Sequence, residues 1–244
     1  KPSNLYLAGT SIFTAGKLGE KGNVGISTGQ FFRPVSKETT EDVSAGYYSD
    51  NKSMAVIYQD NALFLGAPDG HSHCACAAGN NYCDHTSIKF APWESATSLP
   101  ESVNWYLTQD VTVTNRSGPT NAGLNLCLNG HTITPADTYA NSRAFYLRGT
   151  SKLTLTDCAA TPGKISGFTN TALMFDSGCT DAAISIHNIE ISGNVTGKTG
   201  SAIIVQGTGV FNLYSGKIVN NEADIWVSPK KTDDVNISGG TFTQ

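Results

Sequence analysis

The sequence is poor in charged residues and has no excess of positive charge. Of its 244 residues only 15% are Asp, Glu, Lys or Arg, and the formal net charge is −4. Nucleic-acid-binding domains usually carry a basic patch or stripe, so this composition indicates no nucleic-acid partner. Apolar runs are short, and none approaches the roughly 20 residues of a membrane-spanning helix. We therefore expect no membrane insertion of this chain.

Helical periodicity is missing as well, and turn-forming residues are abundant instead. The chain contains 25 Gly, and Thr, Ser and Asn are frequent. Apolar residues alternate with polar ones in short runs, which is typical of strands with one buried face. Low charge combined with many turn residues favours an all-β fold over a helical one.

A short phrase with two alternating apolar residues recurs in the second half of the chain. Its copies begin at Leu124, Leu153, Ile184, Phe211 and Val235. Successive copies lie 24 to 31 residues apart, and self-similarity at such a period indicates a solenoid of stacked repeats.

Each copy of the phrase is followed by two further candidate strands. The second strands centre on Ile133, Ile165, Ile191, Ile218 and Phe242, and the third carry apolar pairs from Phe145/Leu147 to Ile225/Val227. One coil cannot bury these residues alone, whereas stacked coils place them in columns about 4.8 Å apart, the strand spacing. We predict a right-handed parallel β-helix with three short strands per coil over residues 101–244.

Two smaller regions precede the predicted β-helix. Residues 1–70 are predicted to be β-rich, with a strand at Asn4–Leu7 that resembles a coil strand and a hairpin over residues 54–65. Residues 71–100 are predicted to form a Cys/His-rich linker, because turn residues at 67–70 mark a boundary in front of it.

The linker holds a cluster with metal-site chemistry. Cys74 and Cys76 form one short pair, and Cys83 and His85 form another beyond a Gly-Asn-Asn turn. Thiolate and imidazole are the usual ligands of a closed tetrahedral zinc site, so we predict a structural zinc ion on these four residues. Metal binding would also supply folding energy to a segment with few apolar residues.

Alternatives to this ligand set stay open. His71 and His73 stand just before the cluster and are alternate ligands. The single residue between Cys74 and Cys76 departs from the usual zinc-knuckle spacing of two or more. A disulfide from Cys74 or Cys76 to Cys83 is the second interpretation, and thiols without any bond are the third.

The remaining cysteines, Cys127, Cys158 and Cys179, stand in or beside predicted coil strands. Cys127 points outward if its neighbours point inward, and Cys158 follows the equivalent strand one coil later. A disulfide between these two requires their Cα atoms to approach within about 7 Å. The alternative is that each is an unpaired small residue at a coil corner.

The outward positions of the third strands form an apolar column of Tyr146, Met174, Ile204 and Trp226. A continuous exposed apolar stripe usually marks an interface. We favour coverage of the column by part of residues 1–100, and the alternative is a binding surface for a glycan or a protein partner. Outward positions of the first strands are polar instead, from Asn125 to Asn236.

The acidic residues of the repeats do not form an obvious catalytic pair. Glycosidases need two carboxyl groups roughly 5 to 10 Å apart, and no two acids share aligned outward positions on neighbouring coils of one face. We predict a solvated cross-coil ion pair between Asp176 and Arg148. No catalytic residue is assigned.

Three stretches carry a resemblance to a known group of proteins. They are His73–Cys76, Trp105–Val113 and Leu126–Ile133. Together they resemble the repeat unit of large modular surface proteins of anaerobic, often gut-dwelling Gram-positive bacteria, which carry right-handed parallel β-helices in series. The resemblance implies an extracellular, cell-surface or cell-wall location and neighbouring repeats of the same protein as partners. It implies no catalytic residues.

We therefore expect a non-catalytic structural or adhesive module, a stalk or display segment of a larger surface protein. The chain starts at Lys1 without Met and ends just after a strand, so we expect the natural protein to continue. The alternatives are a carbohydrate-active β-helix enzyme, either a glycoside hydrolase or a polysaccharide lyase, and a glycan-binding module. Glycans and host or cell-surface proteins are the expected partners, and a structural zinc ion is the only expected cofactor.

Overall fold

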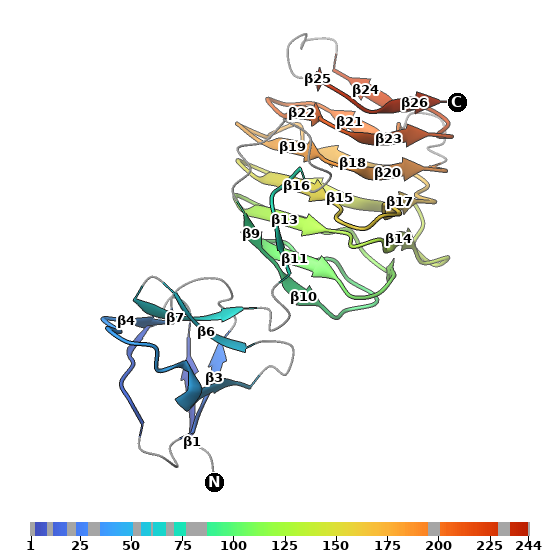
Figure 1. Ribbon diagram of the computed structural model, residues 1–244. Helices are drawn as coiled ribbons and strands as arrows, with labels where there is room; N and C mark the ends of the chain where they lie inside the picture. The colour runs from blue at the N-terminus through green and yellow to red at the C-terminus, as the bar shows by residue number, and fades with distance from the viewer. Residues whose placement is uncertain are drawn as a thin grey trace. The chain divides into compact units, whose positions relative to one another are not determined.

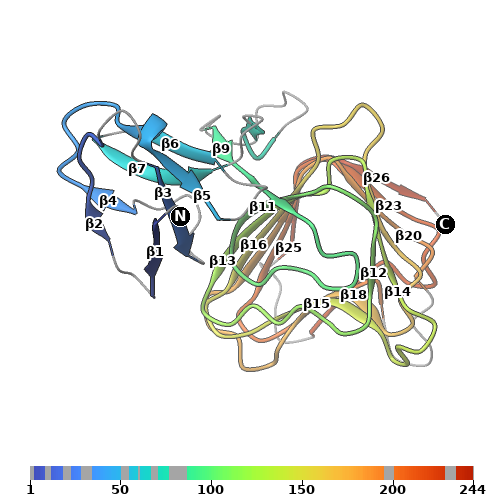
Figure 2. The same ribbon diagram turned by 90° about the horizontal axis from the view of Figure 1, so that it is seen from below.

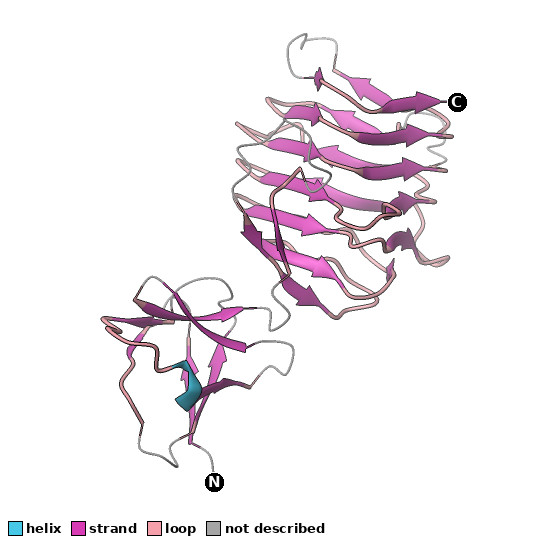
Figure 3. Cartoon of the chain, in the orientation of Figure 1, coloured by secondary structure: helices cyan, strands magenta, loops and turns pink. Residues whose placement is uncertain are grey.

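The computed structural model describes residues 3–8, 12–18, 23–28, 35–50, 55–59, 61–66, 71–76, 87–194, 201–228 and 235–243. Within these residues the fold is all-β, with one short 3-10 helix, η1 (Ser44–Gly46) (Figure 3). The chain divides into two compact units, one of Lys1–Ser72 with Lys89–Pro92 and one of His73–Ile88 with Trp93–Gln244. Among the described residues, no helix is long and apolar enough to cross a membrane.

The first unit is built from short parallel strands and one hairpin. Its strands are β1 (Ser3–Leu7), β2 (Phe13–Thr14), β3 (Val24–Thr28), β4 (Ser36–Lys37), β5 (Tyr47–Ser49), β6 (Ala55–Gln59) and β7 (Ala62–Gly66). Strands β1, β3 and β5 form one parallel sheet, and β2 pairs with β4. The hairpin predicted from the sequence is confirmed for β6 and β7, while Met54 lies outside the described residues. Fully buried Ile26, Val35 and Leu63 anchor this unit's core.

Three parallel sheets build the solenoid, as Figure 1 shows. Sheet 1 contains β10 (Ala91–Trp93), β11 (Val103–Leu107), β13 (Gly123–Cys127), β16 (Lys152–Thr156), β19 (Ala183–Ile186), β22 (Val210–Leu213) and β25 (Val235–Ile237). Sheet 2 contains β12 (Val111–Val113), β14 (Thr132–Pro135), β17 (Lys164–Ser166), β20 (Ile189–Ser192), β23 (Gly216–Val219) and β26 (Thr241–Thr243). Sheet 3 contains β15 (Arg143–Leu147), β18 (Thr171–Phe175), β21 (Ile203–Val205) and β24 (Ile225–Val227). Two short strands, β8 (Ser72–His73) and β9 (Ile88–Lys89), pair with each other.

The predicted parallel β-helix is therefore present, with one strand from each sheet in a complete coil. Seen along the stack, the three sheets form three sides around a common interior (Figure 2). The register pairs Leu124 with Leu153 and Leu153 with Ile184, so equivalent apolar residues lie in columns. All three are buried in one continuous core, as stacking of otherwise incomplete coils requires.

The corners of the coils use residues that tolerate a left-handed backbone. Gly167, Gly193 and Asn220 each follow a strand of sheet 2, and their φ angles are 79°, 63° and 53°. Gly adopts this conformation without steric cost and Asn does so more readily than most residues. One such residue turns the chain from sheet 2 towards sheet 3, which explains why Gly and Asn recur with the period of the coils.

Candidate metal site

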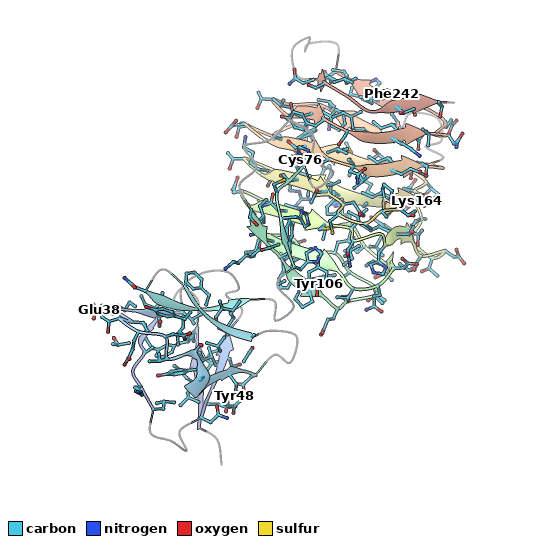
Figure 4. All side chains as sticks on the ribbon, in the orientation of Figure 1. Glu38, Tyr48, Cys76, Tyr106, Lys164 and Phe242 are labelled. Carbon is cyan, nitrogen blue, oxygen red and sulfur yellow. The ribbon has the colours of Figure 1, made fainter. Side chains whose placement is uncertain are left out.

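A short segment, His73–Cys76, lies on the outward side of sheet 1. The hydroxyl of Thr156 on β16 donates a hydrogen bond of 2.5 Å to the carbonyl oxygen of Ala75, although the two residues are 81 positions apart. Cys76 is fully buried, and Figure 4 shows it beside the strands of the solenoid. The outward side chains of Cys127 and Thr156 are fully buried as well.

This placement assembles a group of metal-ligating side chains. One potential ligand atom from each of His73, Cys127 and Cys158 lies within 4.8 Å of the other two, so the group could hold a metal ion. All three residues belong to the solenoid unit, whereas His71 belongs to the first unit. The contacts of the three solenoid residues define the chemistry of the group.

His73, at the end of β8, presents a neutral imidazole. Its Nδ1 atom lies 2.8 Å from the carbonyl oxygen of Cys74. A carbonyl oxygen only accepts hydrogen bonds, so Nδ1 carries the hydrogen, and Nε2 carries the lone pair that a metal requires. Burial lowers the pKa of His73, although the hydrogen bond to Cys74 and the charge of Asp157 act in the opposite direction. The ring is therefore ready to ligate at neutral pH.

Cys127, the last residue of β13, and Cys158, two residues after β16, form a thiol pair. The Cys127 thiol donates to the Cys158 sulfur across 3.6 Å. This hydrogen bond, together with burial, raises the pKa of Cys127, and it lowers the pKa of Cys158. Cys158 therefore ionises first. The proton of Cys127 leaves only when a cation replaces it, as happens when a metal binds to thiols.

The distance between the two sulfur atoms fits a shared metal better than a bond between them. A disulfide requires an S–S length of about 2.05 Å. Two thiolates on a tetrahedral zinc ion, each about 2.3 Å from the metal, lie about 3.8 Å apart. The observed 3.6 Å separates Cys127 and Cys158 by nearly that ligand-to-ligand distance. The structure thus brings together the pair that the sequence identified, as two thiols in contact.

Asp157 fixes the turn that carries Cys158. Its Oδ2 atom accepts hydrogen bonds from the backbone N–H groups of Gly130 and Gly163, each at 2.8 Å. Its Oδ1 atom accepts from the N–H of Ala159 at 2.6 Å. These bonds immobilise the residues on both sides of Cys158, and they place a negative charge near the site, which favours a bound cation.

Only some of the ligands predicted from the sequence lie among the described residues and can be compared with this group. Cys74 and Cys76 have their sulfur atoms 3.4 Å apart, but neither belongs to the group. Cys83 and His85 lie outside the described residues. Of the two alternate ligands, His73 lies beside Cys127 and Cys158 within the solenoid unit, and His71 belongs to the other unit. The sequence showed one signal for these cysteines, their near-equivalent positions in consecutive repeats.

The predicted apolar column on sheet 3 is aligned in register. Tyr146 pairs with Met174, Met174 with Ile204, and Ile204 with Trp226. Exposure along the column is uneven, from 8% for Ile204 to 42% for Trp226. The column therefore ends on an exposed indole ring, and its predicted role in binding stays a prediction.

Arginines surround the first residue of this column. The guanidinium carbons of Arg116, Arg143 and Arg148 lie 4.5, 5.7 and 5.2 Å from the centre of the Tyr146 ring. The Tyr146 hydroxyl donates a hydrogen bond of 2.5 Å to Asp176, and this bond lowers the pKa of the Asp176 carboxyl. The predicted Asp176–Arg148 ion pair is therefore replaced by a tyrosine–carboxylate bond, with the charge of Arg148 making a smaller contribution.

Sheet 1 carries a different outward surface, a polar ladder that runs from coil to coil. Its aligned positions are Asn104, Asn125, Thr154, Ser185, Asn212 and Asn236. Asn125 donates to Asn104 across 2.8 Å, and Asn236 donates to Asn212 across 3.0 Å. These amides satisfy one another, which stabilises the stacking of neighbouring coils.

Comparisons of the chain with models of protein families, with curated proteins and with solved structures find no match. The parallel β-solenoid and its His/Cys group are consequently the features from which a function can be inferred.

Proposed function

We propose that this chain is a non-catalytic structural module, a stalk or display segment of a larger bacterial surface protein. In this proposal a zinc ion on His73, Cys127 and Cys158 fastens the segment at residues 73–76 to sheet 1. The fold supports the first part, because stacked coils with one continuous core give a rigid rod-like element. The geometry of the His/Cys group supports the second.

One observation carries the structural role: acidic side chains of the solenoid are used to join neighbouring coils. Asp157 bonds the backbone of Gly130 in the preceding coil, and Asp110 bonds the N–H of Thr132 at 2.8 Å. Glu190 lies 3.4 Å from Lys164 one coil earlier. A glycosidase keeps two carboxyl groups for substrate, whereas these carboxylates are engaged by the scaffold itself.

Location and partners follow from the resemblance of the sequence to surface-protein repeats. On that basis the module lies outside the cell, on the surface or in the cell wall, next to further repeats of the same protein. Host or cell-surface proteins and glycans are then its partners in adhesion. An extracellular setting also makes oxidation of Cys127 and Cys158 the competitor of metal binding.

The structural role is tested by incubating the full chain with mixed plant and host polysaccharides and measuring newly formed reducing ends and unsaturated sugar products. We expect neither to rise above the level of a heat-denatured sample. Release of either product by the folded chain would replace the proposal with a carbohydrate-active enzyme.

The metal is tested by elemental analysis of protein purified without chelator. We expect about one equivalent of zinc, the stoichiometry of one tetrahedral site. The double variant Cys127→Ser/Cys158→Ser should lose the zinc. Cys179→Ser is the matched control, because that thiol is also buried but bonds only the carbonyl of Leu147 among the described contacts.

Two results would overturn the metal proposal. The first is a chain without zinc in which mass spectrometry finds Cys127 linked to Cys158. The second is zinc that persists in the Cys127→Ser/Cys158→Ser variant but is lost from Cys74→Ser/Cys76→Ser, because that outcome assigns the ion to the ligand set first predicted from the sequence.

A further inference from the structure

Sheet 3 has a cavity on its outward side that the stalk function does not use. Its volume is about 260 Å³. The lining residues are Arg143, Asn170, Met174, Ile204, Gln206 and Trp226. They come from all four strands of sheet 3 or from residues directly beside those strands. The cavity therefore spans several coils instead of lying within one turn.

The walls combine an aromatic plate, an apolar floor and amide groups. Trp226 is 42% exposed, while Ile204 beside it is buried and Met174 half-buried. The amide nitrogen of Gln206 donates to the carbonyl oxygen of Phe175 across 2.8 Å, which holds that side chain in place. Aromatic rings favour stacking against flat partly apolar surfaces, and amides pair with hydroxyl groups.

The cavity lies beside an excess of positive charge. Arg143 lines it, and the guanidinium groups of Arg116, Arg143 and Arg148 gather around Tyr146. Asp176 is the carboxylate hydrogen-bonded to that tyrosine. Three cations and one anion thus gather around the Tyr146 ring, so positive charge predominates there.

Arg143 itself has unused hydrogen-bonding capacity. Its Nε atom is buried and has no hydrogen-bond partner among the described residues. A buried donor without an acceptor costs about 1 to 3 kcal/mol, so a shift of the Arg143 side chain towards an acceptor in the cavity would remove a cost of the unliganded state. Guanidinium groups recognise carboxylates through two parallel bonds, which makes a carboxylate the matching acceptor.

We propose that this cavity binds a carboxylated polysaccharide, a chain of uronic acid residues. One carboxylate meets the guanidinium of Arg143, and the face of a sugar ring stacks on Trp226. Sugar hydroxyls pair with the amides of Asn170 and Gln206.

The backbone of sheet 3 argues for a sugar over an acidic peptide. Its strands bond to the next coil, as in the bonds from the N–H of Ile203 to Asp224 and from the N–H of Ser228 to Val205, at 2.9 and 3.0 Å. A peptide that adds a strand to a sheet needs an open edge with unpaired backbone groups. The outward side of this sheet offers side chains only, which suits a ligand recognised through hydroxyl and carboxylate groups.

The proposal is tested by calorimetric titration of the full chain with sodium polygalacturonate, dextran, dextran sulfate and poly-glutamate. We expect polygalacturonate to bind and neutral dextran not to bind. The variants Trp226→Ala and Arg143→Gln should each weaken polygalacturonate binding by about tenfold or more, since aromatic and arginine anchors dominate such contacts. Matched controls are Phe242→Ala and Lys164→Gln, which remove an exposed aromatic ring and a cation from sheet 2 (Figure 4).

Three outcomes would overturn the proposal. The first is no binding of polygalacturonate, or binding that Trp226→Ala and Arg143→Gln leave unchanged. The second is equal binding of dextran sulfate with the same response to both variants, because charge alone would then explain recognition. The third is tighter, variant-sensitive binding of poly-glutamate, which would make the occupant a peptide. Circular dichroism of each variant distinguishes lost contacts from lost folding.

Discussion

Sheets 1 and 3 are built from the same kind of coil but use their outward side chains in opposite ways. On sheet 1 the aligned amides bond one another, as Asn125 does with Asn104. On sheet 3 the aligned residues are aromatic or aliphatic, and arginines flank them. A face that satisfies its own hydrogen bonds belongs to the scaffold, whereas a face with excess charge and an exposed ring retains capacity for a ligand.

Sheet 1 also has a second row of outward side chains, which are covered instead of facing solvent. Cys127 and Thr156 point outward but are fully buried, and Thr156 bonds Ala75. That row meets a segment from elsewhere in the chain instead of solvent. The two sheets therefore present three kinds of outward surface. Sheet 1 has the polar ladder and a covered row that includes metal-ligating groups, and sheet 3 has the apolar column flanked by arginines.

The largest loss of stability is expected from substitutions in the core of the solenoid. This loss should be the same on sheets 1 and 3. Leu155 on sheet 1 and Leu173 on sheet 3 both point into the core and are fully buried. Replacing either with Ala should lower the free energy of unfolding by about 3 kcal/mol, through lost burial and the cavity left behind. Urea denaturation measures the change. A loss below about 1 kcal/mol at either position would show that this sheet does not share the common core.

A slightly smaller loss of stability is expected from acid, and we expect it mainly through sheet 1. His187 is buried and stacks on Tyr214 with ring centres 4.7 Å apart, and burial lowers its pKa to about 4. The unfolded chain binds the proton near pH 6.5, so stability is complete above that value and falls as the pH drops towards 4. The loss should reach about 3 kcal/mol at most.

The acid effect is measured by urea denaturation between pH 7 and pH 4. His187→Phe keeps an aromatic ring against Tyr214 but removes the titration, so its stability should fall less over this range. His131→Gln is the control, because that imidazole lies at the surface 3.3 Å from Asp110. An unchanged pH profile in His187→Phe would show that another group causes the acid sensitivity.

The polar ladder should contribute a modest amount of stability and nothing to ligand binding. Asn212 donates to the Ser185 hydroxyl and accepts from Asn236. Asn212→Ala should cost about 1 kcal/mol, the usual net value of a hydrogen bond at this exposure. Polygalacturonate titration of the same variant should match the native chain. A loss of binding would mean that the ladder, and not sheet 3, meets the ligand.

The smallest effect on stability is expected from the arginines of sheet 3. Arg148 is exposed, and it shares the Tyr146 ring with two other cations that repel it. Arg148→Gln should change the free energy of unfolding by less than about 0.5 kcal/mol, because the lost ring contact is offset by relief of repulsion. A cost above about 1 kcal/mol would place Arg148 in the scaffold instead.

The fold was predictable because local patterns repeat. Alternation at Leu124 and Leu126, copied at Leu153 and Leu155, fixes which side chains face inward and which strands pair, and the observed register agrees. Gly or Asn at the corners marks where each coil turns. These signals lie within one period of the sequence, so no knowledge of distant contacts was needed.

The His/Cys group was not predictable in full, because it depends on a contact between distant residues. The closely spaced Cys74 and Cys76 suggest a local site, yet the group draws Cys127 and Cys158 from two consecutive coils. Their meeting with His73 follows from the placement of the 73–76 segment on sheet 1, which no local pattern encodes. The bond from Thr156 to Ala75 shows the long range of that contact.

The character of sheet 3 was predictable only in part for a similar reason. Alternation correctly aligned Tyr146 and Met174, but it did not predict that Ile204 would be buried or that Tyr146 would lie among arginines. Long side chains such as Arg116 reach across coils from neighbouring turns. Their destinations depend on tertiary packing and not on strand periodicity.

The uninterrupted strand register constrains how such a protein can change its length. Each coil pairs only with the coils directly before and after it, as the pairing of β13 with β11 and β16 shows. Losing one residue inside a strand turns the following side chains of that strand to the wrong side. Duplicating or removing one whole coil preserves the pairing on all three sheets. Evolution can therefore lengthen the solenoid by copying a stretch of DNA that encodes one coil.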